Sequence, residues 1–193
     1  MPRPSVEGAR RDALVEAAIA EIGRRGTLDV TVGVIARRAG VSTALAHHYF
    51  GSKGHILTAA MRRILRDLRC EHLGRLRSAD GPRARLGATL AACFNAGGFR
   101  GEVVAAWLSF YVSALHDEEA RRLLHLYQRR LRSALIADLR PLAGADAPAL
   151  AETVAALIDG HYIREATGRT EASATRVLAS VEAVLDRLLE GRT

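Results

Sequence analysis

Residues 35–54, IARRAGVSTALAHHYFGSKG, bring together His47, His48, Tyr49 and Lys53. Imidazole and phenol side chains can act as general acids or bases, bind a metal ion, or contact a charged partner. A metal ion shared by the two histidines is excluded, because adjacent residues of a helix point about 100° apart. The sequence also has no nucleophile elbow, zinc-protease motif or phosphate-binding glycine loop. We therefore expect no catalytic residue, metal or cofactor, and contact with a charged partner instead.

The positive charge of the chain lies in its first 77 residues. Residues 1–77 hold 14 Lys and Arg against 7 Asp and Glu, whereas residues 78–193 hold 14 of each, so the first part carries the whole net charge of +7. Genomic base bias can enrich arginine, and Lys53 is the only lysine, but such bias would not confine the excess to one part. A basic module on a neutral body is typical of a nucleic-acid-binding protein.

Apolar residues recur at helical spacing along most of the chain, and no alternating strand pattern is present. Helices are therefore the elements that position His47, His48, Tyr49 and Lys53. Residues 9–24 predict a first helix. Thr31, Ser42 and Ser52 are suited to cap the next three helices, the last of which runs to about Arg77.

The rest of the chain divides into about five further helices. Pro82 suits the first turn of the next helix. Later breaks are expected at four places: 97–98, 116–117, 141–148 and 168–170. We predict an all-α chain of about nine helices, with domains at residues 1–52 and 53–193, in which residues 53–77 form a linking helix.

The second and third helices are predicted to form a helix-turn-helix, since they are short and Gly40 gives the turn its backbone freedom. This arrangement leaves Thr43, Ala44 and His47 on the outward side of the third helix, where they can reach base edges. His48, Tyr49 and Lys53 follow at its far end, where phosphates would lie. Phosphate contacts fix the register of such a protein on DNA, and base contacts supply the sequence preference.

The sequence also predicts the cellular compartment of the protein and whether it contacts a membrane. Cys70 and Cys93 stand far apart, as expected of ordinary thiols in a reducing compartment. Glu16 and Glu21 interrupt the apolar residues near the N-terminus, so no signal peptide is expected. No window reaches the roughly 18 apolar residues of a membrane span. The sequence predicts a cytoplasmic protein that does not contact a membrane.

Aromatic residues suggest where a ligand could bind. Trp107, Phe110 and Tyr111 share one helix face at spacings i, i+3 and i+4. Such a face can be plain core, or it can wall a pocket, because aromatic rings hold cations. Tyr127, His161 and Tyr162 are candidates to join it from neighbouring helices, and both interpretations stay open.

Two amphipathic segments near the C-terminus, residues 149–167 and 172–189, predict a homodimer. They have more apolar surface than the core of one chain requires. This favours an isologous contact in which two such helices from each of two chains pack together. The predicted interface residues are Leu150, Val154, Leu157, Ile158, Val177, Val181, Val184, Leu185 and Leu188.

The segment TVGVIARRAGVSTALAHHYFGSKGHIL, residues 31–57, resembles the DNA-binding signature of TetR-type transcriptional regulators. It has Thr, Ile-Ala, Ala-Gly-Val-Ser, Tyr-Phe and Ser-Lys in the family's order and spacing. The resemblance covers roughly residues 10–60 and implies a dimeric repressor with an N-terminal DNA-reading head (residues 1–52) and a C-terminal helical domain for ligand and dimer. It places phosphate contacts at Thr31, Ser42, His48, Tyr49 and Lys53. It places base contacts at Thr43, His47 and Ala44, a position often held by Gly in the family.

Two later segments, WLSF at 107–110 and LIDGHYIR at 157–164, resemble the choline-responsive BetI group of that family. His161 and Tyr162 stand where that group usually has Leu and Trp. The resemblance implies that choline or a related quaternary ammonium releases the protein from a near-palindromic double-stranded operator. Two alternatives remain open: a TetR-type regulator that responds to a hydrophobic drug or another metabolite, and a structural DNA-binding protein without a ligand.

Overall fold

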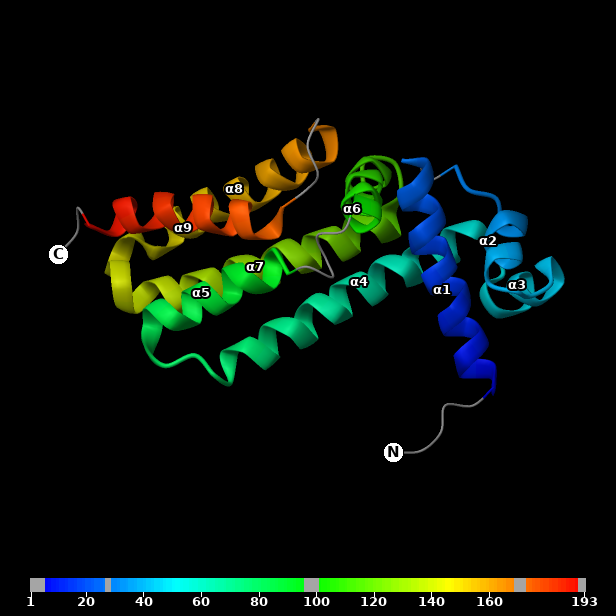
Figure 1. Cartoon of the computed structure of the whole chain (residues 1–193), viewed down its shortest axis with the longest axis horizontal. Helices are drawn as coiled ribbons and strands as arrows, with labels where there is room; N and C mark the ends of the chain where they lie inside the picture. Colours follow the sequence, from blue (N-terminus) through cyan, green and yellow to red (C-terminus); the bar gives the residue numbers. More distant parts are fainter. Residues whose placement is uncertain (1–5, 27–28, 96–100, 169–172, 191–193) are drawn as a thin grey trace. The chain divides into compact units, whose positions relative to one another are not determined.

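The computed structural model describes residues 6–26, 29–95, 101–168 and 173–190 (Figure 1). These residues form nine α-helices and one short 3-10 helix, and no strand is found among them. The helices are α1 (Val6–Arg25), α2 (Val32–Arg38), α3 (Thr43–Phe50), α4 (Lys53–Leu76), α5 (Gly81–Cys93), α6 (Gly101–Ser113), α7 (Glu118–Ala143), η1 (Gly144–Asp146), α8 (Ala147–Thr167) and α9 (Ala174–Glu190). The all-α prediction is confirmed. Among the described helices, none has the length and apolar character that a membrane crossing requires.

The chain forms two compact units. The division into a DNA-binding and a ligand-binding domain at residues 52 and 53 stays a prediction. The first unit comprises Met1–Ile64 and Gly101–Arg122, and the second comprises Leu65–Arg100 and Leu123–Thr193. Helix α6 belongs to the first unit because it packs against α1. A Cβ added to Gly23 would lie 2.3 Å from the Cα of Glu102, so this crossing requires a glycine.

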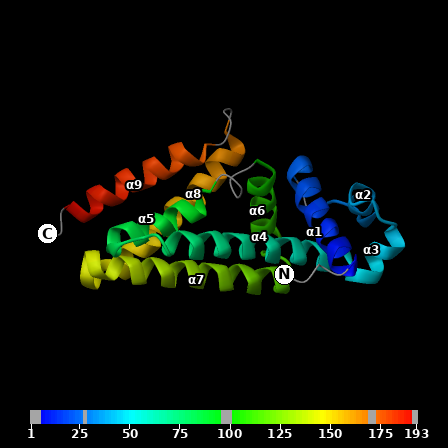
Figure 2. The same cartoon turned by 60° about the horizontal axis from the view of Figure 1, so that its bottom comes forward.

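Helices α1, α2 and α3 form the predicted DNA-reading head, and α2 and α3 lie beside α1 in both views (Figures 1 and 2). The predicted apolar face of α1 is buried: Leu14, Ala17, Ala18, Ile19 and Ile22. Ile35 of α2 and Ala46 of α3 are fully buried. Burial of these side chains fixes the two short helices, which would be too short to persist alone.

The predicted caps are present. The Thr31 and Ser42 hydroxyls accept hydrogen bonds from the backbone N–H groups of Val34, at 3.4 Å, and Leu45, at 3.1 Å. Ser52 accepts one from the His55 N–H at 3.4 Å. A Ser, Thr or Asp at this position satisfies a backbone donor that the helix leaves unpaired.

The turn between α2 and α3 is a Schellman motif. The N–H of Val41 donates to the Ala36 carbonyl at 3.0 Å, and the N–H of Gly40 donates to the Arg37 carbonyl at 3.2 Å. Gly40 has φ +68°, a left-handed conformation that costs glycine little. The turn therefore closes α2 within two residues and delivers the chain directly to the Ser42 cap.

The core of the second unit is built from α5, α7, α8 and α9. Its largest fully buried side chains are Leu86, Leu90, Leu135, Leu139, Ile158 and Leu185. Pro82 lies in the first turn of α5, as predicted. The predicted break at 97–98 lies outside the described residues, and α8 ends at Thr167 close to the break predicted at 168–170.

Two predicted breaks flank α7. The break at 116–117 is confirmed, and Asp117 accepts a hydrogen bond from the Ala120 N–H at 2.7 Å. The break predicted to begin at Pro141 was wrong at its start, because α7 includes this proline and ends at Ala143. Pro141 lacks the N–H that would bond the Ala137 carbonyl, but only two helical residues follow it, so a bend at this point displaces little of the helix.

A buried polar network crosses the second unit. Thr89 donates a hydrogen bond to Oδ2 of Asp138 at 2.7 Å, and Nε2 of His72 lies 2.9 Å from the same threonine oxygen. Since the threonine proton goes to the carboxylate, His72 acts as the donor. Arg85 pairs with the other oxygen of Asp138 at 3.4 Å. Asp138 and Thr89 are both buried, so the network joins α4, α5 and α7 inside the core.

Candidate nucleic-acid interface and effector site

Helix α3 presents the predicted base-facing residues to solvent. Thr43, Ala44 and His47 are all exposed, while Ala46 and Phe50 on the opposite side are buried. The guanidinium of Arg11 lies 5.1 Å from the centre of the Phe50 ring, which ties the end of α3 to α1. A rigid helix with a free outward face is the arrangement that enters a major groove.

The environment of His47 fixes its tautomer. Its Nδ1 lies 3.2 Å from the carbonyl oxygen of Gly51. Because a carbonyl oxygen can only accept, Nδ1 carries the proton and donates. In the neutral ring Nε2 is then a hydrogen-bond acceptor, which gives His47 a definite preference among base edges.

The predicted phosphate-contacting residues keep at least part of their surface exposed. Thr31, Ser42 and His48 are exposed, and Tyr49 and Lys53 are half-buried. The Thr31 and Ser42 oxygens accept the cap hydrogen bonds, which leaves each hydroxyl proton able to donate to a phosphate. Lys53 Nζ lies 3.1 Å from Oδ1 of Asp29, whose side chain is 91% exposed. On binding a phosphate, Lys53 would therefore replace its contact with the exposed Asp29 carboxylate by a contact with the DNA.

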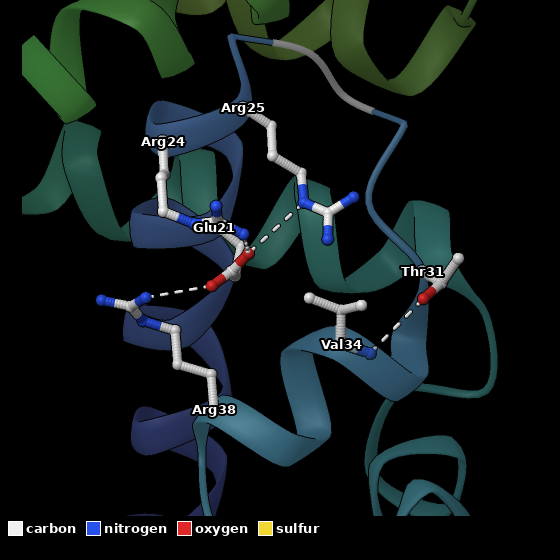
Figure 3. Close-up of polar contacts among 6 residues, drawn as sticks. All are labelled: Glu21, Arg24, Arg25, Thr31, Val34 and Arg38. Carbon is white, nitrogen blue, oxygen red and sulfur yellow. Dashed lines mark hydrogen bonds and ion pairs between the residues drawn. The ribbon is translucent and has the colours of Figure 1, made fainter.

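An unpredicted cluster of charges joins α1 to α2 (Figure 3). Oε2 of Glu21 accepts hydrogen bonds from Arg24 at 2.8 Å and from Arg25 at 3.4 Å, and Oε1 accepts one from Arg38 at 2.9 Å. Glu21 is 5% exposed. The hydrogen bond from Arg24, supported by those from Arg38 and Arg25, outweighs burial and lowers the pKa of Glu21 to about 2.

The sequence did carry a signal for Glu21. It follows the buried positions Leu14, Ala17 and Ala18 at spacings of seven, four and three residues, so it lies on the apolar face of α1. An acidic residue on such a face, with arginines three and four residues later, is typical of a buried ion pair. The only role predicted for Glu21 was to interrupt the apolar residues near the N-terminus.

The predicted ligand-binding residues divide between the two units. In the first unit, the Trp107 ring centre lies 6.2 Å from that of Phe110 and 6.1 Å from that of Tyr111. Trp107 and Phe110 are buried, and Tyr111 is half-buried. Trp107 and Phe110 are thus part of the core of the first unit, whereas Tyr111 keeps part of its surface accessible.

In the second unit, the Tyr162 hydroxyl donates to the Cys93 carbonyl at 2.5 Å, and its ring stacks on Phe94 with centres 6.0 Å apart. His161 meets the Phe94 ring edge-on at 6.3 Å. Burial lowers the pKa of His161, against the opposing influence of Glu165, so the neutral ring is favoured. Tyr127 lies half-buried on α7.

A hollow of about 600 Å³ lies between the end of α4 and α5. Its lining combines an ion pair with small side chains: Glu71, Gly74, Arg75, Ser78, Ala79, Ala84, Gly87, Ala88 and Ala91. None of the predicted ligand-binding residues lines this hollow, so the aromatic clusters and the hollow are separate features.

The predicted dimer residues fall into two classes. Six are buried within the chain: Leu150, Val154, Ile158, Val177, Val181 and Leu185. The packing of the second unit already covers these six side chains, so the predicted interface cannot rest on them alone. Leu157 and Leu188 are half-buried, and Val184 is 38% exposed. Of these three, Val184 offers the most surface to a partner.

Comparison with known proteins agrees with this architecture. Residues 14–60 match the family model described as bacterial regulatory proteins of the tetR family. Residues 82–190 match the model described as the C-terminal domain of BetI-type transcriptional repressors.

Named relatives and solved structures extend the likeness over almost the whole chain. The HTH-type transcriptional regulator BetI of Agrobacterium fabrum is 49% identical over 191 residues, covering 98% of this chain and 93% of the relative. The protein of the same name from Rhizobium meliloti is 52% identical over 166 residues, covering 86% and 82%. A transcriptional regulator from Saccharomonospora viridis, solved in complex with choline, has a TM-score of 0.82 at 25% identity and covers 91% of this chain and 95% of its own.

Proposed function

Because the chain belongs to the TetR family of bacterial transcriptional regulators and has a BetI-type C-terminal domain, we propose that it is a cytoplasmic repressor released from its operator by choline or a related quaternary ammonium. The observation that carries operator binding is α3. Its outward face is exposed from Thr43 to His47, its inward face is anchored by Ala46 and Phe50, and capping hydroxyls flank it.

The charges of the DNA-reading head supply the attraction to DNA, and α3 supplies the preference. Lys53 and the hydroxyls of Thr31 and Ser42 would contact phosphates, which sets the register without reading sequence. Thr43, Ala44 and His47 would meet base edges in the major groove. A homodimer would place two such heads on half-sites about one helical turn apart, which makes the operator near-palindromic.

Release by an effector follows from a two-state equilibrium. A ligand that binds one conformation better than another shifts the population by the ratio of its two affinities, and DNA affinity changes by the same coupling. Helix α4 is the proposed lever. It begins at Lys53 beside α3, its first half belongs to the first unit, and from Leu65 onward it belongs to the second.

The choline complex of the Saccharomonospora relative supports a quaternary ammonium as effector. A trimethylammonium group makes no hydrogen-bond donation, so aromatic faces and carboxylates are its natural partners. The accessible part of Tyr111, next to Trp107, is the candidate in the first unit. Tyr162, His161 and Tyr127 are the candidates in the second. An aromatic contact with a desolvated cation stabilises it by about 2 kcal/mol or more, which is roughly thirtyfold in affinity.

The test begins with DNA selected from a randomised duplex pool by the wild-type protein. Choline, betaine and 3,3-dimethylbutan-1-ol, the uncharged isostere of choline, are then titrated against the complex, with DNA anisotropy and Trp107 fluorescence as readouts. Choline should release the DNA at a concentration roughly thirtyfold lower than the isostere.

The other outcomes separate the alternatives. Release by an uncharged compound, with no effect of choline at millimolar concentration, would replace choline by a hydrophobic effector. DNA binding without sequence selection and without any ligand response would indicate a structural DNA-binding protein. Tyr111→Leu and Tyr162→Leu, compared with each other, show which aromatic cluster holds the cation, because only the cluster in contact changes the choline titration.

A further inference from the structure

Glu21 has a role in the DNA-reading head that its position on α1 alone would not suggest. Its two oxygens serve different helices. Oε2 bonds Arg24 and Arg25, which lie three and four residues along the same helix, whereas Oε1 bonds Arg38 of α2, 17 residues away. Of these three contacts, only the one to Arg38 joins two elements (Figure 3).

Arg38 lies at the junction between α2 and the turn that leads to α3. It is the last residue of α2, and the Schellman hydrogen bonds at Gly40 and Val41 follow at once. The Ser42 cap then starts α3. A short, rigid turn transmits any displacement of the end of α2 to the start of α3. The ion pair between Glu21 and Arg38 therefore acts together with the burial of Ile35 in setting where the base-facing residues begin.

Glu21 stays ionised at physiological pH, since hydrogen bonds from the arginines hold its pKa far below neutrality. Three guanidinium groups share one carboxylate, and each keeps exposed surface: 56% for Arg24, 37% for Arg25 and 43% for Arg38. Without Glu21 these three cations would lose their shared carboxylate, on a DNA-reading head that is already basic. They would then attract phosphates of any sequence.

We propose that Glu21 is a positioning residue for operator recognition: it raises the ratio of operator affinity to non-specific DNA affinity by holding Arg38, and it limits the attraction to DNA of any sequence by restraining three arginines. The proposal rests on the operator-binding function proposed above. It assigns Glu21 no contact with DNA. The two effects differ in kind. Correct placement of α3 favours the operator alone, whereas restraint of the arginines lowers the affinity for every duplex, because attraction to phosphates is independent of sequence.

The experiment measures binding of full-length protein to the selected duplex and to a scrambled duplex across a salt series. Glu21→Gln keeps the size of the side chain and removes its charge. We expect operator affinity to fall about tenfold, scrambled-duplex affinity to stay equal or rise, and the salt slope to rise by up to about one. A head that had merely unfolded would lose both affinities in proportion and would not gain salt dependence.

Two arginine variants provide matched controls. Arg38→Gln removes the contact between helices, and Arg24→Gln removes a contact of similar length within α1. Arg38→Gln should lower the affinity ratio as Glu21→Gln does, and the double variant should add little to either. Arg24→Gln should leave the ratio near that of the wild type. Thermal melts of each variant confirm that the head is folded.

The proposal is overturned if Glu21→Gln leaves the affinity ratio unchanged, or if Arg24→Gln lowers it as much as Arg38→Gln. Failure of the proposed function gives a different result. In that case the wild-type protein itself would select no duplex from the pool and would bind selected and scrambled DNA alike.

Discussion

At the scale of single residues, the hydrogen bond from His47 to the Gly51 carbonyl determines what α3 can read. With Nδ1–H donated to that carbonyl at 3.2 Å, neutral His47 offers Nε2 as an acceptor. In the major groove the donors are the amino groups of adenine and cytosine. His47 should therefore favour one of these bases at its position.

Substitution of His47 tests this preference. His47→Ala should relax selection at one or two base pairs by about 1–3 kcal/mol, and His47→Asn, which keeps an acceptor, should retain part of it. Selection from a randomised library, followed by sequencing, measures both. Loss of affinity for all sequences alike in His47→Ala would show that the residue contacts phosphate instead.

Lys53 should behave in the opposite way, because a lysine on a phosphate carries no sequence information. Lys53→Ala should weaken binding to all duplexes alike and reduce the salt slope by about one unit. Lys53→Arg keeps the charge and should preserve the slope. A base-specific loss in Lys53→Ala would contradict the assignment.

At the scale of helices, the network of His72, Thr89 and Asp138 is expected to hold α4, α5 and α7 together. Thr89→Val keeps the shape of the side chain but leaves Oδ2 of the buried Asp138 carboxylate without its donor. The expected loss in free energy of unfolding is about 1–3 kcal/mol. Chemical denaturation measures it, and Thr153→Val, an exposed threonine on α8, is the control. Equal stability of the two variants would show that the network contributes nothing.

The same network predicts how stability depends on pH. Burial lowers the pKa of His72 below its ordinary value of 6.5, although Asp138 opposes the shift. The unfolded chain therefore binds the proton more readily than the folded chain. This contribution to stability is fully present above pH 6.5 and is lost as the pH falls from there through the lowered pKa. His72→Gln should flatten that dependence in denaturation curves. If the dependence of the free energy of unfolding on pH is unchanged in His72→Gln, it would be assigned to His161 instead, whose pKa is also lowered.

Local sequence signals predicted most helix boundaries. Thr31, Ser42 and Ser52 cap where expected, because a side-chain hydroxyl and a backbone N–H three residues later are set by local geometry. The exposure of Thr43, Ala44 and His47 was predicted for the same reason, since helical spacing decides which face packs.

Features that depend on distant contacts could not be predicted in this way. Packing of α6 against α1 through Gly23 places residues 101–122 in the first unit, and no local pattern indicates this partner. The contact between Glu21 and Arg38 also spans 17 residues. Six of the predicted dimer residues proved to be core, because an apolar helix face looks the same in sequence whether its own chain or a partner covers it.

At the scale of the whole molecule, burial changes which substitution tests the dimer. Val181→Asp would place a charge in the core, since Val181 is 1% exposed, and would unfold the chain whatever its oligomeric state. Val184 is 38% exposed on α9. Val184→Asp should keep the helical circular dichroism signal and convert a dimer to a monomer in sedimentation.

A control for this substitution exists elsewhere in the chain. Val112 on α6 is 61% exposed, and Val112→Asp should leave the sedimentation coefficient unchanged. Val184→Asp should also weaken binding to a two-half-site duplex much more than binding to a single half-site, because only the former requires two heads. A Val184→Asp protein that sediments as a dimer would move the interface away from α9.

The two cysteines differ in a way that provides a reporter of conformational change. Burial raises the pKa of the Cys93 thiol to about 12, so it is a poor nucleophile, whereas Cys70 on α4 is exposed. A maleimide dye should therefore attach to Cys70 of the unmodified protein with high selectivity. Each subunit would then carry one fluorophore on α4, and energy transfer between the two fluorophores of a dimer would follow the proposed lever directly as effector or DNA is added.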